Sequence, residues 1–164
     1  MVTAGLAWYE MVGRLGLALV LGAMIGAERE LDGQDAGLRT HALLSIGCAL
    51  FALVSVAGFD QFVTDSTTNV NVDVTRVAAY VAGGVGFIGG GVIMKHRTRI
   101  AGLTTAASLW TVAAIGVACG IGFWVGALAA TVLSVAVLGP LERISRRVRA
   151  RSRRSDPDGD PVGG

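Results

Sequence analysis

Charged residues divide this chain into five apolar segments, and this division constrains the fold more than any other feature. Each segment is 17 or 18 residues long, and they cover residues 11–27, 42–58, 77–94, 103–119 and 121–138. Helices of this length are among the shortest that can span the hydrocarbon core of a bilayer, which is about 30 Å thick. The sequence therefore predicts an all-α, polytopic transmembrane bundle of five helices.

The composition favours a membrane protein with a single folded domain. Of the 164 residues, 52% are hydrophobic and 16% are charged, whereas ordinary soluble domains carry about 25% charged residues. The 24 glycines suit membrane helices that pack closely against one another. We expect residues 1–142 to form the transmembrane domain and residues 143–164 to form a basic cytoplasmic tail that is partly disordered.

The basic residues predict how the bundle is oriented. Twelve of the fourteen Lys and Arg residues lie in the first loop, the third loop and the C-terminal tail, which a five-helix topology places on one side. Because cytoplasmic loops are enriched in Lys and Arg, we expect the N-terminus outside and the C-terminus in the cytoplasm. Arg14 is expected near the outer end of the first helix, reaching the headgroups or pairing with Glu10.

Two short sequence features bear on how the helices are connected. Gly120 separates the last two apolar segments, so we expect a tight hairpin there in place of one helix over 103–138, which is too long to cross once. Residues 36–40 (Ala-Gly-Leu-Arg-Thr) resemble residues 101–105 (Ala-Gly-Leu-Thr-Thr), 65 positions later. Helices 1–2 and 3–4 are therefore candidate parallel repeats, with chance as the alternative explanation.

Residues 84–89 match the G-x-G-x-x-G pattern of dinucleotide-binding loops, but they lie inside an apolar segment and not between a strand and a helix. Packing explains the glycines better, because Ala82, Gly86 and Gly90 recur every four residues and would let another helix approach closely. We expect Trp110 to be wedged against this face. A ligand-lined break in the helix is the alternative.

The first loop concentrates charged side chains, namely Glu28, Arg29, Glu30, Asp32, Asp35 and Arg39. If the first helix continues by one turn, Glu28 and Asp32 share a face and, with retained waters, are able to hold Mg²⁺. We favour a structural cap in which Glu28 pairs with Arg29 or Arg39. His41 follows this loop, and we expect it at the membrane interface and not as a metal ligand.

The fourth apolar segment carries hydroxyl side chains on one face, at Thr104, Ser108 and Thr111. We expect them to form hydrogen bonds between helices, with a polar permeation path as the alternative. Thr104 or Thr105 is also a candidate helix cap. Because no Asp or Glu falls within the core of any apolar segment, an ion-coupled pump is disfavoured.

No nucleophile–base pair or metal-ligand cluster is visible in the sequence, so we expect no enzyme activity, no cofactor and no metal site. Cys48 and Cys119 both fall in apolar segments and are expected to be small core residues. The basic tail accompanies no aromatic platform, so we expect no nucleic-acid partner.

Four blocks of this sequence, in one order, resemble the MgtC/SapB family of bacterial inner-membrane proteins. They are residues 26–30 (Gly-Ala-Glu-Arg-Glu), 37–41 (Gly-Leu-Arg-Thr-His), 86–91 (Gly-Phe-Ile-Gly-Gly-Gly) and 102–110 (Gly-Leu-Thr-Thr-Ala-Ala-Ser-Leu-Trp). The resemblance covers about residues 10–142. The residues that we single out as a candidate functional motif are Glu28, Arg29, Glu30, Arg39, Thr40, Gly86, Phe87, Thr104, Thr105, Ser108 and Trp110.

The resemblance implies a role in growth at low magnesium and, in pathogens, in survival inside macrophages. Family members are described as modulators of membrane potential or of a complex such as ATP synthase, so the expected partners are the lipid bilayer and another membrane protein, or a second copy of the chain. The alternative is a small oligomeric cation (Mg²⁺) or solute channel. Many members carry a C-terminal domain of ACT-like fold; we expect a short form that lacks it, in which regulation through that domain is in doubt.

Overall fold

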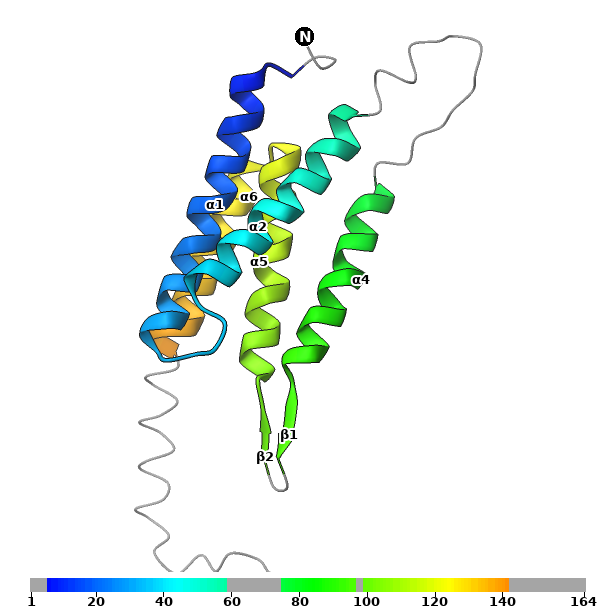
Figure 1. Ribbon diagram of the computed structural model, residues 1–164. Helices are drawn as coiled ribbons and strands as arrows, with labels where there is room; N and C mark the ends of the chain where they lie inside the picture. Colours follow the sequence, from blue (N-terminus) through cyan, green and yellow to red (C-terminus); the bar gives the residue numbers. More distant parts are fainter. Residues whose placement is uncertain (1–5, 59–74, 97–98, 142–164) are drawn as a thin grey trace, which may run out of the picture.

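The computed structural model describes residues 6–58, 75–96 and 99–141, which form a bundle of five α-helices (Figure 1). These helices are α1 (Trp8–Leu31), α2 (Leu38–Leu53), α4 (Thr75–Val92), α5 (Leu103–Ile121) and α6 (Trp124–Ala136). α2 and α6 each continue into a short π-helical segment, η1 (Val54–Gly58) and η2 (Val137–Leu141). The predicted all-α bundle of five helices is confirmed.

Three of the described helices are long and apolar enough to cross a membrane, namely Trp8–Leu31, Leu38–Val56 and Leu103–Ile121. Two shorter apolar helices, Arg76–Val92 and Trp124–Pro140, complete the bundle. Consecutive helices run in opposite directions, so the first loop, the third loop and the end of η2 lie at the same end of the bundle (Figure 1). That all five helices cross the membrane, with the N-terminus outside, stays a prediction.

The first loop is shorter than the apolar segments suggested, because both flanking helices extend into the charged residues. α1 continues through Glu28 to Leu31, and α2 begins at Leu38. The carboxylate Oε2 of Glu30 accepts a hydrogen bond from the Leu38 backbone N–H at 2.9 Å. This bond satisfies one of the amide groups that a helix start leaves without an intrahelical partner.

The third loop contains a β-hairpin that the sequence analysis did not anticipate. β1 (Met94–His96) and β2 (Arg99–Ala101) pair antiparallel and extend from one end of the bundle (Figure 1). Gly102 links β2 to α5 with a φ of +86°, a left-handed conformation that favours glycine. A Cβ at Gly102 would also collide with the carbonyl of Val92. This position therefore requires glycine.

The turn between α5 and α6 lies at Gly122, two residues beyond the predicted break at Gly120. Gly122 has a φ of +87°, and its N–H bonds the carbonyl of Cys119 at 3.1 Å, while the N–H of Phe123 bonds that of Ala118 at 2.8 Å. These two bonds form a Schellman motif, which ends a helix at a left-handed glycine. The predicted hairpin is confirmed, and the single long helix is excluded.

The larger hydrophobic core lies between α1, α2, α5 and α6. Its buried members are Ala18, Leu21, Ile25, Ala49, Val112, Ile115, Cys119, Ala127 and Leu138. α4 joins the bundle through a smaller cluster that consists of Cys48, Val85 and Ala113. Both cysteines are buried free thiols, as expected of small core residues.

Close helix contacts depend on two glycine pairs with G-x-x-x-G spacing, Gly22/Gly26 on α1 and Gly116/Gly120 on α5. Both pairs lie against α2. A Cβ on Gly26 would lie 2.7 Å from the Cα of Leu38, and a Cβ on Gly116 or Gly120 would meet a backbone carbonyl of α2. Small residues at this spacing let helix backbones approach closely.

The predicted packing of the Ala82/Gly86/Gly90 face against another helix of this chain is wrong. Added Cβ atoms at Gly86 and Gly90 meet nothing within 4 Å among the described residues. α4 instead contacts α5 through another side, where Val85 is buried and a Cβ on Gly89 would lie 3.6 Å from the Cβ of Ala106. α4 is continuous through its glycines, so the alternative of a ligand-lined break is also wrong.

Candidate functional site

A buried cluster of polar side chains lies where the end of α1 meets the beginnings of α2 and α5. Arg29 is only 1% exposed. Its Nη2 donates hydrogen bonds to Oε1 of Gln34 at 2.8 Å and to Oγ1 of Thr105 at 3.1 Å. Because a buried guanidinium is costly unless its donors are satisfied, these bonds stabilise Arg29 in its buried position. They also connect α1 to the first loop and to α5. We call Arg29, Gln34, His41, Thr105 and Ser108 the polar cluster.

His41 completes the polar cluster from α2, and it is fully buried. Its Nδ1 lies 2.9 Å from the carbonyl oxygen of Gly37, and its Nε2 lies 3.0 Å from Oγ of Ser108. Because a carbonyl only accepts, Nδ1 donates, and in the neutral ring Nε2 accepts a hydrogen bond from the Ser108 hydroxyl. The Ser108 oxygen also lies 2.9 Å from the carbonyl oxygen of Thr105, which is the other acceptor within reach of its single hydroxyl proton. The expectation that His41 is interfacial is therefore wrong.

The acidic residues of the predicted motif have separate positions. Glu30 is exposed and caps α2 through Leu38. Glu28 lies against η2, with its Oε1 3.2 Å from the position of a Cβ on Gly139. The predicted ion pair between Glu28 and Arg39 does not form, because Arg39 is exposed and has no carboxylate partner among the described residues.

The predicted hydroxyl face of α5 lines a cavity of about 260 Å³ between α5, α6 and η2. Thr104, Ser108 and Thr111 share this face, as predicted, and Ser134 of α6 joins them. Of these, Ser108 reaches another helix, through His41, whereas Thr111 and Ser134 donate to carbonyls one turn earlier in their own helices. The prediction of interhelical bonds is confirmed for Ser108. The predicted threonine cap is wrong, because α5 begins after Gly102 without a side-chain cap.

The other predicted site residues lie away from the polar cluster. Thr40 is exposed, and Phe87 is 85% exposed beside the open Gly86. Trp110 is 53% exposed and lines a shallow groove between α4 and α5 together with Ala82. The prediction that Trp110 is wedged against the glycines of α4 is therefore wrong.

At the opposite end of the bundle, the Arg14 side chain contacts the end of α5 and the beginning of α6. Its Nη1 donates to the carbonyl of Gly120 at 2.8 Å, and its guanidinium lies 5.6 Å from the ring centre of Trp124. A cation at the C-terminus of α5 also interacts favourably with the helix dipole. Glu10, the predicted partner of Arg14, instead accepts a hydrogen bond from the N–H of Ala7 at 3.3 Å.

Sequence reasoning missed Gln34 and His41 as members of the polar cluster. For His41 a signal existed, since positions 41, 45 and 48 fall on one helical face whose other members, Ser45 and Cys48, are small. A polar residue on such a face of an apolar helix is expected to bond across to a neighbour. For Gln34, in a loop, no periodic signal was available. Among the described residues, no three His, Cys, Asp or Glu side chains are grouped to hold a metal ion.

Two relatives illustrate what this chain is similar to. It is 42% identical over 139 residues to the "Putative magnesium transporter YhiD" of Escherichia coli (strain K12), an alignment that covers 85% of this chain and 64% of that protein. It is 42% identical over 131 residues to "Protein MgtC" of Salmonella typhimurium (strain LT2), covering 80% of this chain and 52% of that protein. The chain therefore spans between about half and two thirds of the length of these relatives.

No solved structure matches the chain. The family model described as the MgtC family matches residues 15–147, a range that contains the polar cluster and the hydroxyl-lined cavity. The match covers most of the chain and confirms the family that the four sequence blocks indicated. This chain belongs to the MgtC family.

Proposed function

We propose that this chain is a non-enzymatic, multi-pass protein of the bacterial inner membrane that supports growth at low magnesium by acting on a larger membrane complex. In a pathogen, the same role would support survival inside macrophages. The name of the Escherichia coli relative connects it with magnesium. The observation that carries the proposal is a glycine-rich face of α4 that contacts no other helix among the described residues.

This outward face consists of Gly83, Gly86, Phe87, Gly90 and Gly91. A Cβ on any of its four glycines meets nothing within 4 Å among the described residues, and Phe87 is 85% exposed. Each glycine within a helix costs about 1 kcal/mol relative to alanine, and exposure to lipid offers no compensation. Contact with a further helix compensates for this cost, because glycines allow two helix backbones to approach closely.

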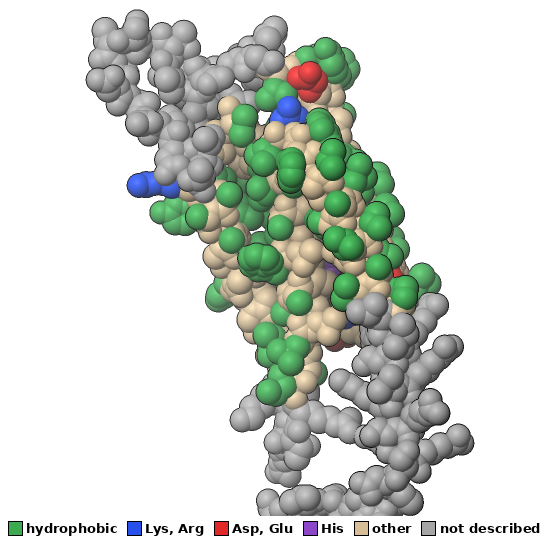
Figure 2. Space-filling model, turned by 180° about the vertical axis from the view of Figure 1, so that it is seen from behind, with side chains coloured by type: hydrophobic (Ala, Val, Ile, Leu, Met, Phe, Trp, Pro, Cys, Tyr) green, Lys and Arg blue, Asp and Glu red, His purple; other side chains and the backbone are tan. Residues whose placement is uncertain are grey.

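Other exposed surfaces of the bundle carry larger apolar side chains. On α6, for example, Val125, Val132 and Leu133 are all more than half exposed. On the face seen in Figure 2, hydrophobic side chains are spread along the bundle and few charged ones appear, as expected for contact with lipid tails. The outward face of α4 differs, since a large side chain stands among glycines. This pattern suits a partner helix, and we propose that the partner belongs to a complex that sets or uses the membrane potential, such as ATP synthase.

A second candidate function is supported by the hydroxyl-lined cavity. Thr111 and Ser134 each donate a hydrogen bond to a carbonyl of their own helix, and Ser108 donates to Nε2 of His41. Their oxygen lone pairs then remain as acceptors, which suits a cation or a solute rich in donors. A small channel, formed by one or several copies of the chain, is therefore the alternative.

Growth at low magnesium tests the leading proposal in a bacterium that lacks its own gene of this family. We expect Gly86→Leu to be produced at the normal level and to fail to restore growth, because leucine blocks the outward face. Gly16→Leu is the matched control, since Gly16 on α1 also has open space around it. Normal growth with Gly86→Leu would contradict the proposal.

Cation flux into liposomes that contain the purified protein separates the two candidates. The leading proposal expects no flux above that of empty liposomes. Flux that disappears in a Ser108→Val or Thr111→Val variant would establish the channel instead.

A further inference from the structure

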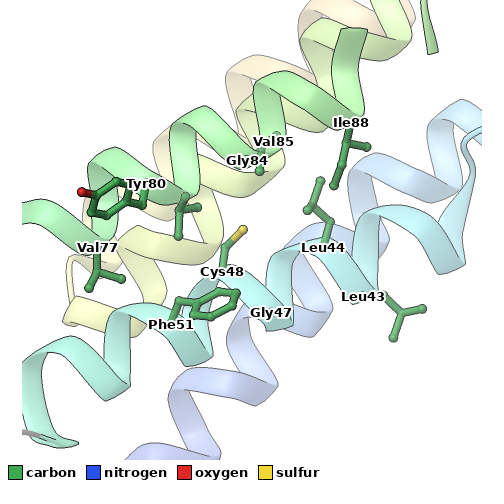
Figure 3. A pocket seen from close by; sticks show the side chains of 11 residues that line it. Leu43, Leu44, Gly47, Cys48, Phe51, Val77, Tyr80, Gly84, Val85 and Ile88 are labelled. Atoms are coloured by element: carbon green, nitrogen blue, oxygen red, sulfur yellow. The ribbon is translucent and has the colours of Figure 1, made fainter. Parts of the chain in front are cut away.

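An apolar groove of about 530 Å³ runs between α2 and α4, on a different side of α4 from the outward face (Figure 3). From α2 it is lined by Leu43, Leu44, Gly47, Cys48 and Phe51, and from α4 by Val77, Tyr80, Val81, Gly84, Val85 and Ile88. The two glycines create much of its width, because an added Cβ on Gly47 or Gly84 meets nothing within 4 Å. The function proposed above does not use this groove.

The length of the groove corresponds to one leaflet of a bilayer. Its lining on α4 extends from Val77 to Ile88, which is eleven helical rises of 1.5 Å, or about 17 Å. Half of a hydrocarbon core of about 30 Å is about 15 Å. The groove begins near the N-terminal end of α4. In the predicted five-helix topology it would run from one membrane surface to about the middle of the bilayer.

The lining of the groove matches a hydrocarbon chain. Apart from the Tyr80 hydroxyl and the Cys48 thiol, the side chains that line it are hydrocarbon. A flexible hydrocarbon chain therefore matches both its length and its chemistry.

Polar groups are found at the surface end of the groove. Tyr80 lies at the same end as Val77, and its hydroxyl points away from Cys48 toward that end (Figure 3). The exposed Arg76 immediately precedes Val77. A cation at the membrane surface attracts an anionic headgroup, and a tyrosine hydroxyl suits the same interfacial depth. The groove thus combines an apolar channel of one leaflet's length with an arginine that directly precedes its first lining residue on α4.

We propose that the groove between α2 and α4 binds one acyl chain of an anionic phospholipid from the leaflet in which α4 begins, with the lipid phosphate near Arg76 and Tyr80. The lipid fills the space between the two helices and so supports α4, whose buried contacts with α5 are confined to one side. This inference is independent of the proposed function, because the lipid and the partner helix occupy different sides of α4.

Native mass spectrometry of protein purified in a mild detergent tests the proposal. We expect one retained phospholipid per chain in the wild type and at least a fivefold lower lipid-bound fraction in Gly84→Leu and Gly47→Leu, whose side chains fill the groove. Gly86→Leu is the matched control on the outward face of α4 and should retain the lipid. Thermal stability without added lipid is measured for each variant, so that loss of lipid is not confused with unfolding.

A charge variant tests the headgroup part of the proposal. In competition between phosphatidylglycerol and phosphatidylethanolamine, one cation at the membrane surface corresponds to a preference of up to about fivefold for the anionic lipid. We expect Arg76→Gln to lose this preference while still binding lipid. An unchanged preference would overturn the role of Arg76. A wild type without retained lipid, lipid retention in both groove variants, or a dimer peak that disappears in Gly84→Leu would overturn the groove as a lipid site.

Discussion

Replacing Gly26 by alanine tests the close contact between α1 and α2. A Cβ on Gly26 would lie 2.7 Å from the Cα of Leu38 and 2.8 Å from the carbonyl oxygen of Gly37. Both are backbone atoms, so they cannot rotate away as a side chain can. Since ordinary contacts begin at 3.4 Å, the two helices must separate by about 0.7 Å, and overpacking of this kind costs about 1–3 kcal/mol.

The matched control is Gly16→Ala in the same helix, where an added Cβ meets nothing within 4 Å. Both variants gain the same helix propensity, about 1 kcal/mol, so this term cancels in the comparison. We expect Gly26→Ala to be about 1–3 kcal/mol less stable than Gly16→Ala. Reversible unfolding in mixed detergent micelles, followed by circular dichroism, measures the difference. Equal stability of the two variants would refute the argument that glycine is required for this helix contact.

Three further predictions concern the polar cluster, the opposite end and the topology. Arg29→Ala and Thr105→Val should each lower the free energy of unfolding by about 1.5–3 kcal/mol, and the double variant should lose less than the sum; strict additivity would show that the two side chains do not interact. Arg14→Leu should cost about 1–2 kcal/mol, because the carbonyl at the end of α5 loses its donor, and a stability equal to wild type would contradict this. Reporter fusions after Gly33 and after Gly122 should read cytoplasmic and external; the reverse pattern would invert the topology.

The helices themselves were predictable because each apolar run between charged residues is long enough for one helix. The ends were less predictable. α1 continues through Glu28 to Leu31, since charged residues at a membrane boundary remain compatible with a helix. The hairpin turn was placed at Gly120, whereas Gly122 makes it. Either glycine could end the helix as far as the sequence shows. Only the left-handed backbone at Gly122 identifies it as the turn residue.

The side of each helix that faces the interior was harder to predict, because membrane helices are apolar on nearly every face and lack the periodic contrast of soluble ones. The glycine face of α4 was therefore assigned to internal packing, although Gly86 is open. Arg29 and His41 each have one partner more than 60 positions away, Thr105 and Ser108 respectively. No local pattern specifies such pairs. The G-x-x-x-G spacing of Gly22 and Gly26 in α1, and of Gly116 and Gly120 in α5, was a usable signal that the sequence analysis did not apply.

The candidate repeat allows the two helix hairpins to be compared position by position. Gly37 and Gly102, 65 positions apart, each precede the first residue of a helix, α2 and α5. These two helices run in the same direction (Figure 1). α1 and α4 therefore occupy corresponding places before them, and a shift of 65 positions aligns Gly22 with Phe87.

The consequence of Phe87 at this place is a different packing of α4. In the first hairpin, a Cβ on Gly26 would lie 2.9 Å from the Cβ of His41, and in the second hairpin Gly89 faces Ala106, which corresponds to His41. Gly89 lies two positions before the counterpart of Gly26, and two positions correspond to roughly 200° of rotation about a helix axis. A phenylalanine cannot replace glycine where two helices touch, so α4 is turned and Phe87 points outward. The first hairpin is thus closed around buried polar groups, while the second leaves an open glycine face on α4 and a groove beside α2.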